Sequence, residues 1–392
     1  MIASFSQRLL EVGSYFENGD YHLGYRRLLD AAIETNNFEV YEHTLHFCDW
    51  YDTAGDKASV NPAIYEKVKD ILTVIQNGYT EPGVKQPVVK LKAENISKKY
   101  SRGNFSLAQI DVDLVESKIV GLVGENGNGK TTLLRLLYGE LKPDTGNIQY
   151  QFSNEVAVGS FYNTKSLLAF IPQRPLAWYG SLMNNLQYAS TFVGLKDRQN
   201  YLWTEMIVAR MGLRPFRTYN WSRISSGYKM RFELARTLVK KPEVLLLDEP
   251  LANLDVLAQQ IILEDLRFLA QSHSMPLSII LSSQQLYEVE KVSDQVIFLQ
   301  KGVAQYQHIG KETATQEMPL IIELETTASR ERLQSLLETR GLQKLSFNGG
   351  VYIMYFDASG NMADVLSAIG EAGLPVKYIR DISVSSRRFF DA

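Results

Sequence analysis

The feature that most constrains the fold of this chain is a glycine-rich turn that joins an apolar run to a helical pattern. The stretch IVGLVGENGNGKTTLLRLL fits G-x-x-x-x-G-K-[ST] at Gly124, Gly129, Lys130 and Thr131. Glycines allow backbone N–H groups to converge on phosphate oxygens, and the following helix points its positive end at the same oxygens. A glycine turn can arise by chance, but the complete pattern between a strand and a helix seldom does. The stretch therefore predicts a nucleoside triphosphate site on an α/β sheet.

Two side chains of this loop have chemistry of their own. Lys130 has the length to reach the β and γ phosphates, and the Thr131 hydroxyl is suited to ligate Mg²⁺. The other nucleotide-binding positions predicted in the loop and the first helical turn are Asn126, Gly127, Asn128 and Thr132.

Downstream of the loop, a second apolar run ends in two carboxylates within PEVLLLDEPLANLD. Asp248 is expected at the carboxyl edge of the sheet, where such folds bind ligands, and is suited to hold Mg²⁺ through water. Glu249 is expected to orient and deprotonate the attacking water. An isolated Asp-Glu pair is commonly a solvated strand end, but its place after the glycine-rich loop favours a role in hydrolysis.

The order of these motifs resembles the nucleotide-binding domain of ABC (ATP-binding cassette) ATPases, over residues 88 to about 310. The stretch ISSGY at 224–228 lies where that family has its signature loop, usually written LSGGQ. The resemblance implies that the helix starting there faces the γ-phosphate of ATP bound by the second subunit of a head-to-tail dimer. Ser225 would donate its hydroxyl and Gly227 its backbone N–H, and the helix dipole would favour the phosphate charge.

Further positions follow from the same resemblance. Tyr100 lies where an aromatic ring stacks on adenine, although a tyrosine at a strand end more often serves packing. Gln173 in AFIPQRP matches the glutamine that reaches Mg²⁺ and senses a partner, and Asp255 in ANLD matches the aspartate that crosses the dimer interface. The segment 181–236 would be the helical subdomain that contacts a transmembrane partner.

The chain departs from the family pattern at three positions. Ser226 replaces the first glycine of the signature, and Tyr228 replaces its usual glutamine. In IILSSQQLYEVE, Gln284 stands where the family has a histidine that hydrogen-bonds the γ-phosphate and can carry charge. Losing such a donor costs ~10²–10³ in rate, so a neutral amide that still donates should cost less. We expect slow hydrolysis with Glu249, Gln284 and Lys130 in catalysis; the alternative is that Gln284 is simply a compatible substitute.

Two breaks in the pattern of apolar residues divide the chain into three expected domains. Residues 1–80 show four helical stretches and predict an all-α accessory domain whose aromatic residues pack in its core, or form a docking surface. Residues 88–312 form the α/β P-loop NTPase. Residues 318–392 read β-α-β-β-α-β, which predicts an α+β ferredoxin-like module with a regulatory or dimerisation role. The final SSRRFFDA suggests a short helix.

Composition narrows the setting in which this chain works. The formal net charge of -3 gives no argument for binding nucleic acid, and we expect none. Cys48 is the one cysteine and lies in an apolar helical pattern, which predicts a buried thiol in a reducing cytoplasm. No apolar run reaches the ~18 residues that a membrane span needs. We therefore expect a cytoplasmic protein that is peripheral on the inner face of the cell membrane through partner subunits.

The resemblance implies an ATP-hydrolysing subunit of an ABC membrane transporter. ATP and Mg²⁺ would be its cofactors, and transmembrane permease subunits and a second ABC subunit, identical or not, its partners. Export is suggested by a loose similarity of the C-terminal module to the tail of ABC-2 exporter ATPases. A weakly hydrolysing regulatory cassette of a heterodimer is an alternative. A soluble ABC ATPase acting on nucleic acid or ribosomes is disfavoured, because the chain has a single P-loop and no basic stripe.

Overall fold

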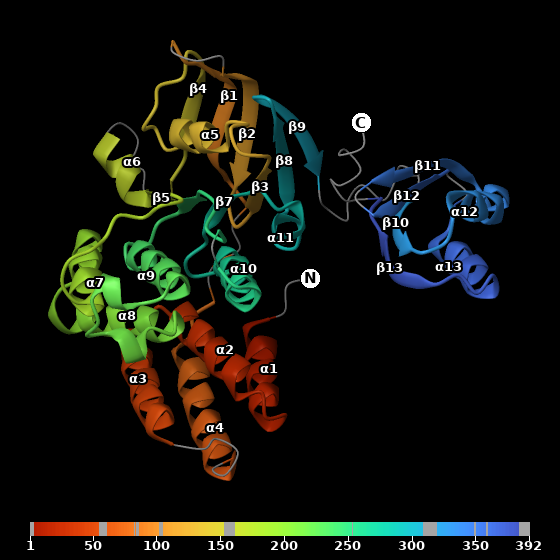
Figure 1. The fold of residues 1–392 in the computed structure, drawn as a ribbon. Coiled ribbons are helices and arrows are strands. Elements are labelled where there is room, and N and C mark those ends of the chain that lie inside the picture. Colours follow the sequence, from red (N-terminus) through yellow and green to blue (C-terminus); the bar gives the residue numbers. More distant parts are fainter. Residues whose placement is uncertain are drawn as a thin grey trace.

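The computed structural model describes residues 4–54, 61–81, 83, 86–101, 105–152, 161–252, 254–308, 320–348, 350–357 and 360–383. Figure 1 shows a group of N-terminal helices below two central sheets, and a C-terminal module that stands to one side. Among the described residues, no helix combines the length and the apolar character needed to cross a membrane.

The N-terminal part consists of helices that match the four predicted helical stretches. They are α1 (Phe5–Glu17), α2 (Tyr21–Glu34), α3 (Phe38–Thr53) and α4 (Asn61–Gly78). Polar residues start them, because side chains of Ser4, Asp20 and Asn37 accept hydrogen bonds from N–H groups of the first turns. Cys48 is fully buried, as predicted, and burial raises the pKa of its thiol to about 12.

The central part contains one six-stranded sheet in the order β5-β6-β7-β3-β8-β9. The strands β5 to β8 pair in parallel, and β9 pairs antiparallel with β8. Their bounds are β3 (Ile119–Val123), β5 (Leu168–Ile171), β6 (Val244–Leu247), β7 (Ser278–Ser283), β8 (Gln295–Gln300) and β9 (Val303–His308). The apolar runs predicted as central strands, β3 and β6, are buried along their whole length.

A second sheet and several helices complete this part. The sheet is antiparallel, in the order β2-β1-β4, with β1 (Val89–Lys99), β2 (Ser106–Val115) and β4 (Thr145–Tyr150). The helices next to the parallel sheet are α5 (Lys130–Leu137), α6 (Phe161–Leu167), α10 (Val256–Ala270) and α11 (Leu286–Glu290). The predicted helical segment contains α7 (Leu182–Ser190), α8 (Asp197–Arg210) and α9 (Ser226–Leu238), joined partly by short 3-10 turns.

The N-terminal helices share a hydrophobic core with the central part instead of enclosing one of their own. A single cluster of buried side chains runs from α1–α4 through α7–α10 to the sheet. At its centre the fully buried Trp203 of α8 lies beside Tyr41 of α3, with ring centroids 6.0 Å apart. Helices α1–α4 are therefore packed into the central part, which the sequence pattern did not reveal.

The C-terminal module has the predicted element order β-α-β-β-α-β. Its elements are β10 (Ile321–Thr326), α12 (Arg330–Leu337), β11 (Leu342–Asn348), β12 (Val351–Phe356), α13 (Met362–Glu371) and β13 (Val376–Asp381). The sheet order is β11-β12-β10-β13 and every pair is antiparallel. An ion pair joins Arg380 to Glu290 of α11, with 3.7 Å between Nη2 and Oε2. The predicted helix in SSRRFFDA lies outside the described residues.

Candidate active site

The glycine-rich loop joins β3 to α5, and its glycines meet two different requirements. Gly127 and Gly129 have φ values of +83° and +102°, in the left-handed region where side chains are strained. Gly124 needs space, since a Cβ there would lie 2.4 Å from the carbonyl oxygen of Leu299. The Asn128 side chain accepts a hydrogen bond from the backbone N–H of Lys301 at 3.1 Å, and so anchors the loop to the β8–β9 turn.

Lys130 begins α5 and points back into the loop. Its Nζ donates to the carbonyl oxygens of Gly124 at 2.7 Å and Glu125 at 3.2 Å. The same nitrogen lies 3.1 Å from Oε1 of Glu249, and both side chains are almost fully buried. The charge of the predicted phosphate-binding lysine is therefore balanced by the carboxylate that is predicted to activate water.

Two amides converge on the other oxygen of Glu249. Oε2 accepts hydrogen bonds from Nε2 of Gln173 at 2.7 Å and from Nε2 of Gln284 at 2.8 Å. The sheet order explains the meeting: β6 lies between β5 and β7, so the residues that follow these three strands emerge side by side. Glu249 itself has a φ of +47°, a strained conformation for a residue other than glycine, of the kind that clusters at functional sites.

Beside this cluster lies the pair predicted to hold Mg²⁺. The Thr131 hydroxyl donates to Oδ2 of Asp248 at 2.8 Å, and Asp248 is buried. Ser282 of β7 donates to Oδ1 of Asp248 and accepts from the backbone N–H of Glu249, both at 2.9 Å. Hydroxyl and carboxylate oxygens are ligands that Mg²⁺ prefers, so the donor set fits this ion. Sequence reasoning missed Ser282, although it ends the apolar run just before Gln284.

Tyr100 lies beside the first turn of α5. Its hydroxyl is 3.3 Å from Oγ1 of Thr132, and its ring centroid is 6.4 Å from that of Phe105. Phe105 in turn lies against the loop, because a Cβ on Gly129 would be 2.6 Å from its ring. The half-buried Tyr100 thus contacts α5 through Thr132, and it also packs on a neighbouring ring. Phe105 is a further residue of this wall that the sequence did not reveal.

The residues predicted to act across a dimer form a separate group. Ser225 is the exposed N-cap residue of α9, and its side chain makes no capping hydrogen bond. Asp255 caps α10 by accepting from the N–H of Ala258 at 2.9 Å. A Cβ on Gly227 would lie 3.7 Å from Cβ of Ala258, so the first turns of the two helices touch. The bulky Tyr228 packs on the ring of Phe216, with centroids 4.2 Å apart.

The loop and its surroundings have the form of a P-loop nucleotide site, and one known family matches the segment that contains them. Residues 107–252 match the family model described as ABC transporter. This segment holds the glycine-rich loop, Gln173, the ISSGY stretch and both strand-end carboxylates. The segment that carries these motifs is therefore similar to the ATPase domains of ABC transporters, a class that binds ATP with Mg²⁺.

The chain is also similar to individual ATP-binding proteins of transporters. The chain is 30% identical over 217 residues to the spermidine/putrescine import ATP-binding protein PotA of Mesoplasma florum, covering 55% of this chain and 60% of that protein. It is 28% identical over 252 residues to the uncharacterized ABC transporter ATP-binding protein YxlF of Bacillus subtilis, covering 64% and 80%. The chain thus spans less than two thirds of the length of PotA.

A solved structure supports the fold. It is that of cbiO1 from Clostridium perfringens, described as part of the ABC transporter complex cbiONQ. The two chains are 23% identical with a TM-score of 0.51, and the match covers 64% of this chain and 95% of that one. At this level of identity the likeness concerns the fold alone.

Proposed function

We propose that this chain binds ATP with Mg²⁺ and hydrolyses it, as the ATP-binding subunit of a membrane transporter. The observation that carries the proposal is the convergence of Lys130, Gln173 and Gln284 on Glu249. The three side chains come from separate parts of the chain, after the glycine-rich loop, β5 and β7. They meet at one carboxylate next to the buried Asp248. Such an arrangement is suited to directing a water molecule at a bound phosphate.

The reaction proposed is attack of water on the γ-phosphorus of ATP. The water oxygen forms the new P–O bond, the bond to the β–γ bridging oxygen breaks, and the water proton passes to Glu249. Lys130 turns from Glu249 to the β and γ phosphates when ATP is bound, and Glu249 stays oriented by the two amides. Thr131 and Asp248 would hold Mg²⁺, which would supply positive charge to the phosphates. Gln284 remains neutral, so we propose slow but real hydrolysis.

A second ABC subunit completes the proposed site. Ser225 is exposed, and its side chain makes no capping hydrogen bond. Gly227 lies against Ala258, whose backbone N–H donates to Asp255 at the start of α10. These helix starts offer N–H and hydroxyl donors to the γ-phosphate held by a partner cassette. ATP would then join the two subunits, identical or not, and closure of the dimer would drive the membrane subunits.

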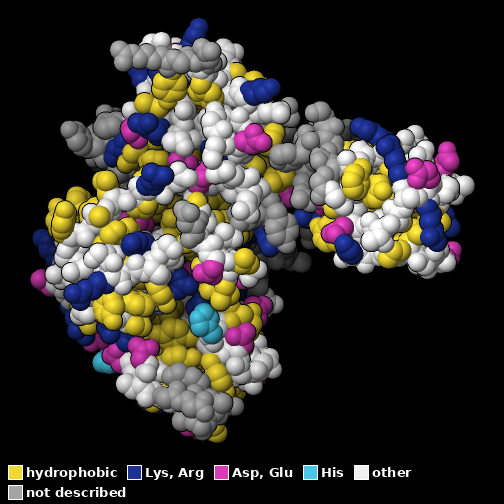
Figure 2. Space-filling view, in the orientation of Figure 1, with side chains coloured by type: hydrophobic (Ala, Val, Ile, Leu, Met, Phe, Trp, Pro, Cys, Tyr) yellow, Lys and Arg dark blue, Asp and Glu magenta, His cyan; other side chains and the backbone are white. Residues whose placement is uncertain are grey.

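An exposed apolar surface supports docking to permease subunits. It comprises large side chains that follow Gln173 along the chain and are 67% to 94% exposed: Leu176, Tyr179, Tyr188 and Phe192. Figure 2 shows hydrophobic side chains gathered at this edge of the molecule, over the region that α7 occupies in Figure 1. Exposed apolar clusters of this kind favour an interface. We propose that transmembrane permease subunits bind here and hold the protein on the cytoplasmic face of the membrane.

Direction of transport and the C-terminal module belong to the same proposal. The β-α-β-β-α-β order and antiparallel sheet support a ferredoxin-like module, with a regulatory or dimer-stabilising role. We propose export, on the similarity of this module to the tail of ABC-2 exporter ATPases. PotA is named an import protein, so direction has to be measured, by the substrate flux of inverted membrane vesicles.

The test of the proposal uses the full chain. Wild type should release phosphate from ATP only with Mg²⁺, and Glu249→Gln should abolish release and form an ATP-dependent dimer, measured by light scattering. Glu94→Gln, at an exposed carboxylate on β1, is the matched control and should behave as wild type. If neither ATP binding nor association with itself or a companion subunit is detected, the proposed function is wrong.

A regulatory cassette of a heterodimer is the second candidate. The neutral Gln284 in place of a histidine is the observation that favours it. A wild-type monomer that binds ATP tightly, hydrolyses none by itself, and gains activity with a companion cassette would support this candidate over an active homodimer.

A further inference from the structure

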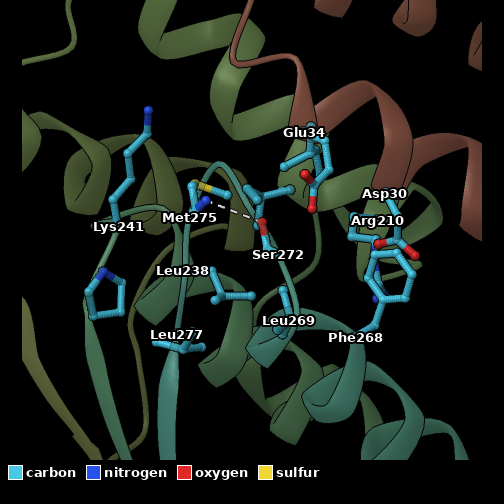
Figure 3. Close-up of a pocket in the computed structure, with 13 residues that line it drawn as sticks. Asp30, Glu34, Arg210, Leu238, Lys241, Phe268, Leu269, Ser272, Met275 and Leu277 are labelled. Atoms are coloured by element: carbon cyan, nitrogen blue, oxygen red, sulfur yellow. Dashed lines mark hydrogen bonds and ion pairs between the residues drawn. The ribbon is translucent and has the colours of Figure 1, made fainter. Parts of the chain in front are cut away.

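A buried ionic junction connects three parts of the chain. Arg210 of α8 bonds through Nε to Asp30 of α2 and through Nη1 to Asp265 of α10, the latter at 2.8 Å. The Arg210 side chain is 1% exposed and the two carboxylates 3%. Arg26 of α2 also pairs with Asp265. Figure 3 shows Arg210 and Asp30 next to one another, with Phe268 beside them.

The charges at this junction are strongly coupled. Burial by itself raises the pKa of Asp265, but the guanidinium charges of Arg210 and Arg26 outweigh it and hold that pKa below its ordinary value. Removing one member of a buried ion pair leaves an uncompensated charge, which costs far more than losing an exposed pair. The relation of α2, α8 and α10 is therefore sensitive to each member of the junction.

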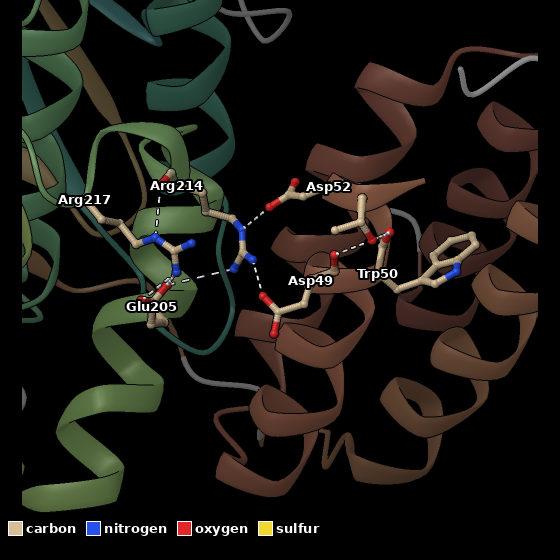
Figure 4. A network of polar contacts seen from close by, with 7 residues as sticks. Asp49, Trp50, Asp52, Glu205, Arg214 and Arg217 are labelled. Atoms are coloured by element: carbon tan, nitrogen blue, oxygen red, sulfur yellow. Dashed lines mark hydrogen bonds and ion pairs between the residues drawn. The ribbon is translucent and has the colours of Figure 1, made fainter. Parts of the chain in front are cut away.

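A second polar network ties the same parts together. Arg214, which follows α8, bonds to Asp49 and Asp52 of α3, with 2.7 Å between Nε and the Asp52 carboxylate. Figure 4 shows the two aspartates reaching Arg214 from the N-terminal helices. On its other side Arg214 lies 3.9 Å from Glu205 of α8, which Arg217 also contacts at 3.0 Å. The N-terminal helices thus contact the C-terminal end of α8 at Arg210 and the segment just after it at Arg214.

These contacts bear on the two helices that face a partner subunit. Helix α8 packs on α9, whose first turn holds Ser225 and Gly227. Asp255 caps the start of helix α10, and Asp265 lies further along that helix. The N-terminal helices therefore hold α8, and with it α9, in a defined relation to α10. None of the junction residues contacts the Lys130–Glu249 cluster through the bonds described above.

We propose that Arg210 and its N-terminal partner Asp30 are positioning residues that set α9 relative to α10, and so control the contacts this cassette makes to ATP bound by a second subunit. This inference rests on the proposed function. The ATP site then has a cis half, which belongs to the chain that binds the nucleotide, and a trans half, which the second subunit contributes. The inference gives the N-terminal helices a role in the trans half that this chain offers to ATP bound by its partner.

A small cavity beside the junction leaves room for a change of side chain there. A cavity of about 30 Å³ is lined by Asp30, Glu34, Arg210 and Phe268 among others, which is room for about one water molecule. Nη2 of Arg210 is buried with no hydrogen-bond partner. A small change of side chain at Asp30 can therefore be accommodated, and the variant Asp30→Asn, which keeps the shape and an acceptor, is the suitable probe.

The experiment separates the cis from the trans half of the site. Asp30→Asn is made in the full chain and in the Glu249→Gln chain. Expected are ATP affinity of the monomer within about twofold of the parent, and a loss of at least tenfold in ATP-driven association and in hydrolysis rate. Glu42→Gln is the matched control, because Glu42 pairs with Arg198 across the same interface but at an exposed site. It should leave all three quantities unchanged.

The possible outcomes distinguish failure of this inference from failure of the proposed function. Unchanged association and hydrolysis in Asp30→Asn overturn the inference, as does an equal loss of monomer ATP binding. Asp30→Glu should restore most of the association, which a purely structural lesion at this helix would not do. If Asp30→Asn fails to fold, Asp49→Asn at the more exposed second network is used in its place. It should fold and weaken ATP-driven association. Unchanged association in Asp49→Asn also overturns the inference. Absence of association in the parent chain contradicts the proposed function instead.

Discussion

Replacing Gln284 tests how Glu249, the carboxylate proposed to activate water, is held. The amide donates to Oε2 of Glu249 at 2.8 Å, and a hydrogen bond to a charged group contributes about 1.5–3 kcal/mol. Gln173 and Lys130 still hold Glu249 when this bond is lost, so the lower figure applies. About 1.5 kcal/mol corresponds to roughly tenfold in rate.

Gln284→Ala should therefore lower kcat about tenfold, with KM for ATP changed much less, because the amide acts on Glu249 and not on the ground-state nucleotide. Gln284→His should raise kcat above wild type. A histidine has an ordinary pKa near 6.5 and is charged below it, so its advantage should grow as pH falls from about 8 to 6. Wild type has no titrating group at this position and should lack that trend.

The assay is steady-state phosphate release with saturating Mg²⁺, read as kcat and KM separately. Gln285→Ala, at the exposed neighbouring glutamine, is the matched control and should be neutral. The reasoning is refuted if Gln284→His leaves the rate unchanged while Glu249→Gln abolishes it. It is also refuted if Gln284→Ala raises KM and leaves kcat intact.

Four further outcomes are expected. Thr131→Ala should lower the affinity for ATP about tenfold when Mg²⁺ is present and little when EDTA replaces it, measured by fluorescence titration. Tyr100→Ala should weaken ATP binding about tenfold if the ring stacks on adenine, whereas Tyr100→Phe should not; equal affinities for all three chains would leave packing as its role. Burial raises the pKa of the Cys48 thiol from 9.0 to about 12. The neutral thiol therefore contributes its full share to the stability of the fold below about pH 9, and this contribution is lost as pH rises toward 12. Unfolding free energy should then fall above pH 9 by up to ~1.4 kcal/mol per pH unit more steeply in wild type than in Cys48→Ala. Deleting residues 1–80 should give aggregated protein, since Trp203 loses its cover; a stable, active remnant would contradict the shared core.

The sequence alone determined the features that depend on near neighbours. The glycine-rich loop, the buried strands β3 and β6 and the four N-terminal helices all follow from local spacing of apolar, polar and glycine residues. The C-terminal element order was predictable for the same reason. The residues of the phosphate site could be predicted together because one short stretch contains most of them.

Only the tertiary structure decided which distant residues meet. Gln173, Glu249 and Gln284 converge because β6 lies between β5 and β7, and strand order is not written in any local pattern. The same order brings Ser282 to Asp248. The union of the N-terminal helices with α8 and α10 was equally hidden, because Arg210 and Asp30 look like ordinary helix-surface charges until packing removes them from water. Burial and long-range hydrogen bonds, which exist only in the assembled fold, settled these points.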